Sequence, residues 1–149
     1  MTPKERAERA AAKMWAADAA SPWVGVELES ADEGAATMTL TVEKHHCNGH
    51  GICHGGIIYV LADTAFAFAS NSRNQSTVAH HNFISYTAPG QLGDNLIAVA
   101  SEISLAGRSG IYDVTVTNQN EKVVAEFRGI SRAIKGHIFD EGNDLGDPA

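Results

Sequence analysis

The sequence of 149 residues has no long hydrophobic run and few cysteines. Its longest apolar stretch, residues 57–69, is interrupted by Asp63 and Thr64 and is too short to span a bilayer. The only cysteines are Cys47 and Cys53, and the first fifteen residues lack the apolar core of a secretory signal. We therefore expect a cytoplasmic protein with free thiols and no membrane partner.

Basic residues are also scarce. There are 11 lysines and arginines against 18 acidic residues, which gives a net charge of -7 and disfavours nucleic acid as a partner. Hydrophobic residues make up 44% and charged residues 19%, the composition of an ordinary globular protein. A chain of this length buries enough surface to fold without a disulfide or a metal. We expect a single domain over residues 1–149.

The first third of the chain predicts a helix followed by two strands. Thr2-Pro3-Lys4-Glu5 is a capping box with proline at the first helical position, and the helix runs to about Ala20, where Ser21-Pro22 ends it. Residues 1–22 thus form an N-terminal helical segment. Residues 24–29 and the clearly alternating residues 36–42 are predicted strands joined by a turn at Glu33-Gly34, and residues 43–53 form a loop.

The rest of the chain predicts a buried helix and a sheet. A helix from His54 to about Ser72 is apolar nearly all round, so most of its sides are buried. Strands follow over residues 77–87, 95–105, 111–117 and 122–134, without intervening helices, which favours an antiparallel sheet. A lone buried helix requires a strongly curved sheet around it. We expect a flexible acidic tail over residues 136–149, frayed and solvated from Phe139 onward.

Asp63 is the only charged residue between Gly55 and Ser72. A carboxylate inside an apolar helix is costly unless it is paired or hydrogen-bonded. Arg73 lies ten residues further along, whereas side chains that meet on a helix lie three or four apart. Asp63 is therefore a candidate for acid, base or nucleophilic chemistry.

Gly55-Gly56 marks the start of the same helix. The first amides of a helix have no partner within it and lie at the positive end of the helix dipole, so they suit a developing oxyanion. Eight residues of helix separate Gly55 from Asp63 by about 12 Å, too far for one small carbonyl to touch both. A symmetric dimer can bring Asp63 of one subunit near Gly55 of the other, which suggests a composite site.

Two motifs carry a family resemblance. Residues 48–56, Asn-Gly-His-Gly-Ile-Cys-His-Gly-Gly, and residues 61–67, Leu-Ala-Asp-Thr-Ala-Phe-Ala, resemble the hotdog-fold acyl-CoA thioesterases, most closely those of bacterial phenylacetic acid degradation. Residues 110–114 and 124–129 fit as well, and the resemblance covers about residues 5–135. It implies an α+β hotdog fold, with a curved antiparallel six-stranded sheet around a long central helix. It also implies a homodimer at minimum, commonly a homotetramer, and no cofactor.

The resemblance further implies residue roles. The Gly55 amide polarises the thioester carbonyl, and Asp63 of the partner subunit attacks it or activates a water. Thr64 orients the carboxylate or the water, and Asn48 and His54 support the carbonyl. Phenylacetyl-CoA and its ring-hydroxylated relatives are the implied substrates. The candidate residues for binding substrate and CoA are Gly56, Arg108, Ser109, Gly110, Arg128 and Arg132, although the last two arginines are equally typical of solvated charges on a sheet.

Three alternatives remain. Metal-ligand types cluster at His45, His46, Cys47, His50, Cys53 and His54, but their spacing matches no four-ligand pattern, so we expect no metal. A hotdog hydratase or dehydratase would use His54 as a base opposite a carboxylate. A non-catalytic acyl-CoA-binding regulator would gain nothing from a buried Asp63.

Overall fold

The computed structural model describes residues 1–144 of the chain. Its helices are α1 (Pro3–Ala17), α2 (Ala20–Val24), the short 3₁₀ helix η1 (Lys44–His46), α3 (Gly55–Ser70) and α4 (Glu141–Asp144). Its strands are β1 (Glu27–Asp32), β2 (Ala35–Thr41), β3 (Gln75–Tyr86), β4 (Asn95–Ala106), β5 (Ser109–Thr117) and β6 (Val123–His137).

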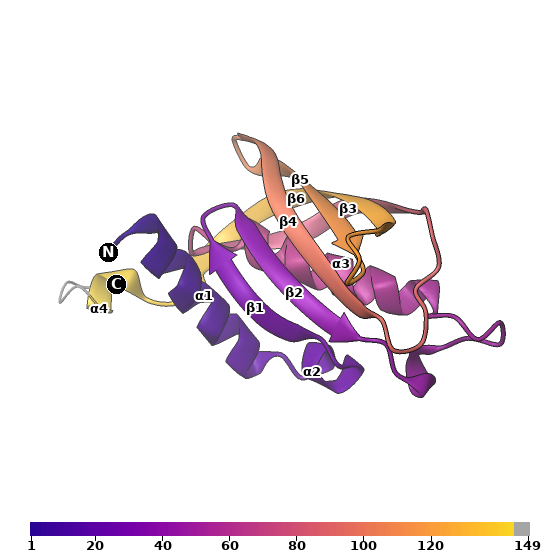
Figure 1. Ribbon diagram of the computed structural model, residues 1–149. Coiled ribbons are helices and arrows are strands. Elements are labelled where there is room, and N and C mark those ends of the chain that lie inside the picture. The colour runs from indigo at the N-terminus through magenta and orange to yellow at the C-terminus, as the bar shows by residue number, and fades with distance from the viewer. Residues whose placement is uncertain (145–149) are drawn as a thin grey trace.

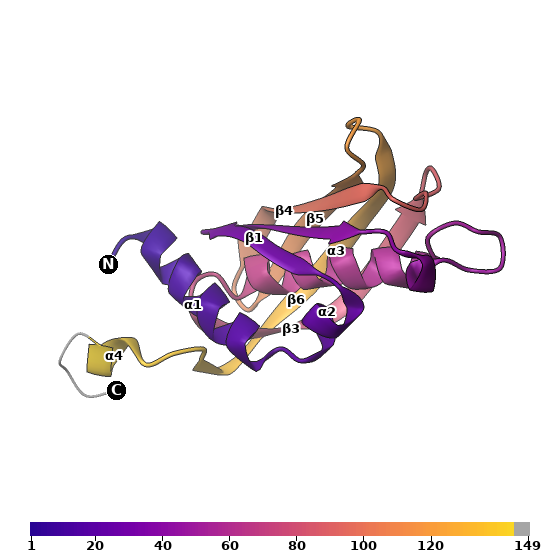
Figure 2. The same ribbon diagram turned by 60° about the horizontal axis from the view of Figure 1, so that its bottom comes forward.

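The strands form one six-stranded antiparallel sheet in the order β1-β2-β4-β5-β6-β3. The sheet curves around α3, while α1 lies along β1 at one margin (Figures 1 and 2). The core forms between α3 and the inner face of the sheet, where Phe66 packs edge-on against Tyr112. This is the hotdog architecture that the resemblance implied. No helix within residues 1–144 is long and apolar enough to cross a membrane.

The N-terminal segment differs from the prediction in its boundaries. The capping box at Thr2 and Glu5 is confirmed, but α1 ends at Ala17. Ser21 and Pro22 lie inside α2 instead of ending a helix. Asp18 accepts hydrogen bonds from the backbone and the hydroxyl of Ser21, and proline is tolerated in a first helical turn because its missing N–H has no partner there. As a result β1 begins at Glu27, three residues later than expected from Val24.

The other elements match their predicted positions closely. The turn at Glu33-Gly34 is confirmed, and the inward residues of β2 are buried as the alternation indicated. The segment expected to be a plain loop contains η1 and a short antiparallel bridge between Cys47 and Cys53. The bridge folds the segment back on itself just before α3.

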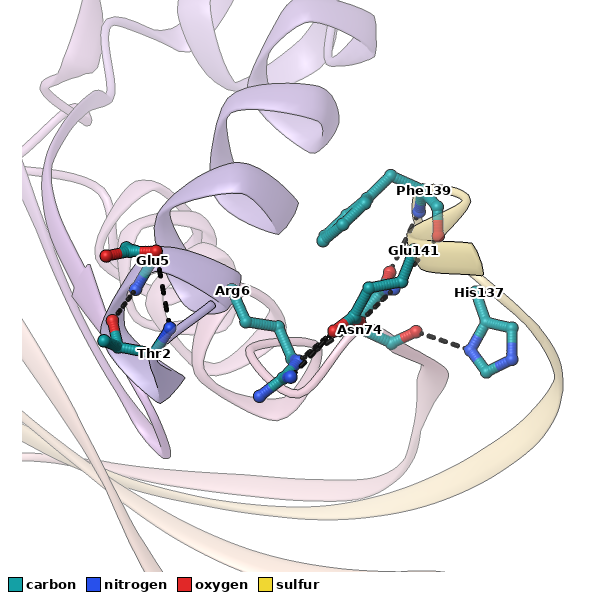
Figure 3. Close-up of polar contacts among 7 residues, drawn as sticks. All are labelled: Thr2, Glu5, Arg6, Asn74, His137, Phe139 and Glu141. Carbon is teal, nitrogen blue, oxygen red and sulfur yellow. Dashed lines mark hydrogen bonds and ion pairs between the residues drawn. The ribbon is translucent and has the colours of Figure 1, made fainter. Parts of the chain in front are cut away.

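The beginning of the C-terminal segment is held in place, contrary to the expectation of a frayed, solvated tail. Phe139 is 7% exposed, and its ring lies against the guanidinium of Arg9. Asn74 accepts from the backbone amides of Ile138 and Phe139 and donates to the Phe139 carbonyl, and Glu141 forms an ion pair with Arg6 (Figure 3). The prediction of a frayed segment from Phe139 onward was based on acidic composition, which does not reveal partners that lie far away in the sequence. Residues 145–149 of the predicted tail lie outside the described residues.

Candidate active site

Asp63 lies on α3 with its carboxylate facing β3. Its Oδ1 accepts a hydrogen bond of 3.1 Å from Nδ2 of Asn82. Burial raises the pKa of Asp63, and the hydrogen bond from Asn82 acts in the opposite direction. Arg73, which the sequence excluded as a partner, forms ion pairs with Glu33 and Glu102 instead. Asp63 is thus a carboxylate without an ion pair among the described residues.

A groove of about 600 Å³ exposes Asp63 between α3 and the segment that links α1 to α2. Thr64 lines the same groove, but its hydroxyl donates to the Val60 carbonyl at 2.7 Å and contacts Oγ of Ser21 at 3.3 Å. Such back-bonding to the preceding turn is common for threonine in helices. In the structure, therefore, the Thr64 hydroxyl is not hydrogen-bonded to Asp63.

The start of α3 presents one available amide. His54 is the N-cap, and its Nδ1 accepts from the Gly56 amide at 2.8 Å. The Gly56 amide predicted for substrate binding is thus already engaged. Within residues 1–144 the Gly55 amide has no acceptor, and the Gly55 carbonyl accepts from the Tyr86 hydroxyl at 2.8 Å. Of the two glycines, Gly55 offers the free donor that an oxyanion requires.

A second groove, of about 490 Å³, contains Gly55. Asn48 lines it together with the segment 86–90 that follows β3. Asn48 Oδ1 accepts from the His50 amide at 2.9 Å, which closes the turn of the loop. Within the described part of the chain its Nδ2 has no acceptor, so Asn48 and Gly55 contribute two unpaired donors to one groove.

Asp63 and Gly55 do not share a groove within one protomer. The residues that line the Asp63 groove and those that line the Gly55 groove are different sets. β3 reaches both groups, since its Tyr86 lines the Gly55 groove and its Asn82 is hydrogen-bonded to Asp63. It is a strand of 12 residues that pairs only with β6 among the described strands. Its unpaired side is a long exposed edge with Val78, Phe83 and Tyr86 at least 46% exposed, the kind of edge that pairs with another chain.

The predicted CoA-binding residues separate into two groups. Arg108 is exposed and lines a groove of about 560 Å³ together with Gln75 and Lys135. Arg128 instead makes a two-bond ion pair with Asp113 on the neighbouring strand, with N–O distances of 2.6 and 2.9 Å. Arg132 lies on the same outer face of β6 and is exposed. Arg128 is therefore already ion-paired. Arg108 donates only to the Ala133 carbonyl, at 3.3 and 3.4 Å, and both Arg108 and Arg132 are exposed.

Ser109 and Gly110 begin β5 directly after Arg108. Gly110 is buried, and a Cβ there would lie 2.7 Å from Oγ of Ser131 and 2.8 Å from the Tyr112 ring. This glycine is thus required by close packing against β6 and Tyr112. Ser109 is exposed opposite Arg132 on β6.

Of the histidines and cysteines that precede α3, His46 and Cys53 are buried. The side chains of Glu43, His45 and His46 lie within 4.8 Å of one another, but both ring nitrogens of His46 are engaged, with the Glu43 amide at 2.9 Å and the Val24 carbonyl at 2.6 Å. Burial raises the pKa of the Cys53 thiol to about 11, so Cys53 is protonated near neutral pH and is a poor nucleophile.

Comparison with known proteins identifies the family whose sequences and structures are similar to this chain. Residues 50–125 match the sequence profile described as the thioesterase superfamily. The chain is 43% identical over 128 residues to the acyl-coenzyme A thioesterase PaaI of Escherichia coli, covering 86% of this chain and 91% of that protein. The solved structure of E. coli PaaI, from the phenylacetic acid degradation operon, superposes with a TM-score of 0.89 at 40% identity and covers 91% of this chain and 99% of that one. A Streptococcus mutans protein bound to acetyl-CoA superposes with a TM-score of 0.73 at 27% identity, covering 76% of this chain and 91% of that one.

Proposed function

The chain belongs to the thioesterase superfamily, and on that premise we propose that it hydrolyses aryl-acetyl-CoA thioesters to the free acid and CoA. Phenylacetyl-CoA and its ring-hydroxylated relatives are the proposed substrates. Acyl-CoA thioesterase activity follows from the family and from the named E. coli relative. The choice of an aryl-acetyl group rests on the likeness to a protein of the phenylacetic acid degradation operon.

One observation carries the proposed mechanism: a carboxylate without an ion pair and a free helix-terminal amide lie on the same helix in separate grooves. Thioester hydrolysis needs a group that stabilises the negative charge on the carbonyl oxygen and a nucleophile or base. The Gly55 amide supplies the first, and one such donor is worth roughly 2.7–4 kcal/mol in the transition state. Asp63 supplies the second, by attacking the carbonyl carbon or by taking a proton from water. Asn48 supports the carbonyl oxygen from the same groove as Gly55.

The two groups meet in a homodimer. Residue 59 is the midpoint between positions 55 and 63, so a two-fold axis beside Tyr59 would set two α3 helices antiparallel and place Gly55 of each near Asp63 of the other. The unpaired edge of β3 supports this arrangement, because antiparallel pairing of two β3 strands would remove both exposed edges at once. A tetramer of two such dimers remains part of the proposal.

The CoA nucleotide is proposed to contact Arg108, Ser109 and Arg132. Arg108 lies in an open groove, and Arg132 is exposed opposite Ser109. Phosphate groups suit the planar, permanently charged arginine side chain. Arg128 is the weaker candidate, since binding a phosphate there would compete with its ion pair to Asp113.

The structure disfavours the hydratase alternative. A hydratase of the proposed kind needs His54 as a base, but Nδ1 of His54 accepts from the Gly56 amide. In the neutral ring the other nitrogen then carries the proton, so His54 is a hydrogen-bond donor on its exposed side. That arrangement suits a helix cap beside the carbonyl site rather than a proton acceptor.

A panel of CoA esters tests the proposed function. Phenylacetyl-CoA, a ring-hydroxylated relative, a straight-chain acyl-CoA and an unsaturated acyl-CoA are each incubated with the protein while released thiol is trapped by a dye. We expect the highest kcat/KM for the aryl-acetyl esters. Preference for the straight-chain ester would refute the acyl assignment, and consumption of the unsaturated ester without release of thiol would establish the hydratase.

A further inference from the structure

Asn82 is the one residue whose side chain is hydrogen-bonded to Asp63 among the described residues. Its Nδ2 donates to Asp63 Oδ1 and to the Tyr59 hydroxyl, both at 3.1 Å. Neither motif behind the family resemblance contains Asn82, which lies on β3, 19 residues beyond Asp63. The contact is therefore a property of how this particular strand folds back onto α3.

A bulge in β3 directs Asn82 toward the helix. Ala79 is opposite Ser131 on β6, and Asn82 is opposite Gly129, with a register shift between Ala79 and His81. Ser131 and Gly129 are both buried on the inner face. Ala79 and Asn82 are three residues apart, and in a regular strand such residues face opposite sides of the sheet. With Ala79 on the inner face, Asn82 would therefore point outward if β3 had no bulge between them. Bulges near active sites commonly redirect one side chain in this way.

The Asn82 amide is hydrogen-bonded through its nitrogen only. Both of its bonds are donated by Nδ2, while its Oδ1 is buried without a partner in the described structure. A buried acceptor without a donor destabilises a fold. An apolar side chain of similar size would fit the position without that cost, so stability alone does not explain an asparagine here.

We infer that Asn82 is a positioning residue for the proposed thioesterase reaction, holding the Asp63 carboxylate in its ionised, reactive orientation. The inference rests on the proposed function. An ionised carboxylate only accepts hydrogen bonds, so the amide NH₂ of Asn82 matches the charged form of Asp63. Tyr59, which accepts the second bond from Nδ2, holds the amide in that orientation.

The surroundings of Asp63 make this donor important. The other titratable groups lining its groove are Asp18 and Tyr59, and no lysine, arginine or histidine lines it among the described residues. The residues of β6 that pair with Asn82 and Ile84 of β3 are Gly129 and Phe127, which do not titrate. Burial raises the pKa of Asp63, and Asn82 counteracts that effect. Removing the donor should therefore raise the pKa further and leave a smaller fraction of Asp63 ionised at a given pH.

The test compares wild type with Asn82→Leu and Asn82→Asp. Asn82→Leu removes the donor and the unpartnered acceptor together, and Asn82→Asp keeps the size but replaces the donor with a second acceptor. We expect Asn82→Leu to lower kcat about tenfold or more at pH 6 and less at pH 9, to move the acidic limb of the pH profile upward and to leave KM largely unchanged. Asn82→Asp should move the limb further. Asn95→Leu, the same replacement at an exposed position, should leave the profile unchanged.

Two readouts separate positioning from a structural role. In acid, where Asp63 is protonated, the melting temperature of Asn82→Leu should equal or exceed that of wild type, because an unsatisfied buried acceptor is removed. It should fall relative to wild type only as Asp63 ionises, because the donor to the carboxylate is missing. NMR titration of the Asp63 carboxyl carbon should show a higher pKa in Asn82→Leu whether or not phenylacetyl-CoA is the substrate, which keeps this inference separate from the proposed function. An Asp63 pKa that is the same in Asn82→Leu and wild type would overturn the role of Asn82. An acidic limb that does not move in Asn82→Leu, although wild-type activity depends on Asp63, would overturn it as well.

Discussion

Replacing Asp63 with asparagine separates the chemical role of this residue from its structural role. The two side chains have nearly the same shape, and an asparagine oxygen can still accept the bond that Asn82 Nδ2 donates to Asp63. The groove and the neighbouring grooves should therefore keep their form, while the base or nucleophile is lost. Positioned acid–base groups contribute about 10²–10⁴-fold, so we expect kcat to fall by at least ~100-fold. That loss corresponds to about 2.7 kcal/mol of transition-state stabilisation.

Stability should change in the opposite direction. Burial raises the pKa of Asp63 in the folded protein, so the folded state favours the protonated acid. This contribution to the free energy of unfolding is fully present below the pKa of the unfolded chain and is lost as pH rises through the folded pKa. Asparagine behaves as the neutral form at every pH. The melting temperature of Asp63→Asn should therefore match wild type in acid and exceed it at higher pH.

The assay is released thiol from phenylacetyl-CoA, measured as kcat and KM, alongside thermal unfolding at several pH values. Substrate binding should be largely kept, so KM changes little. A variant with unchanged kcat would refute the assignment of Asp63. A melting temperature below wild type across the whole pH range would show instead that the carboxylate stabilises the fold.

Three further changes test other parts of the account. Arg108→Ala should raise KM for a CoA ester but not for a thioester lacking the nucleotide. The same replacement at the ion-paired Arg128 should affect KM much less, and equal effects of the two replacements would refute the assignment of Arg108 rather than Arg128 to the nucleotide. Asn74→Ala removes several buried hydrogen bonds, so it should lower the free energy of unfolding by roughly 1–3 kcal/mol and make the segment around Phe139 sensitive to limited proteolysis. Resistance to the protease equal to that of wild type would contradict the role of Asn74. Treatment with a strong chelator should leave turnover unchanged, because the proposed polarising group is an amide and both ring nitrogens of His46 are engaged. Activity that is lost on chelation and returns only with added zinc would contradict a metal-free mechanism.

The sequence predicted the parts of the fold that depend on local patterns. The alternation in residues 36–42, the apolar helix after His54 and the absence of helices between the later strands were sufficient for a curved antiparallel sheet around α3. The boundaries around Pro22 were wrong because the two hydrogen bonds that Ser21 donates to the Asp18 carboxylate are contacts that composition does not reveal. The fixed position of the segment at Phe139 was not predicted for a similar reason, since its hydrogen-bond partner Asn74 lies 65 residues away in the sequence.

The candidate site was predictable only where its groups are unusual in sequence. Asp63 was evident as a lone charge in an apolar helix, and the glycine pair marked the helix start. Asn82 carried no such signal, because regular alternation from Ala79 directs it outward and only the bulge reverses that direction. The ion pair of Arg128 with Asp113 was equally hidden, since it depends on the register between β5 and β6.

The central claim is that each site combines Gly55 of one subunit with Asp63 of the other, and mixed dimers test it most directly. Asp63→Asn subunits are combined with Gly55→Val subunits, whose added side chain would start 3.0 Å from the Tyr86 ring. Each parent should be inactive alone. In a mixed dimer one of the two sites contains no substitution, so random reassociation should restore about a quarter of wild-type activity. Full inactivity, with mixed dimers shown to form, would contradict the shared site and mean that the two groups act within one chain or in another geometry.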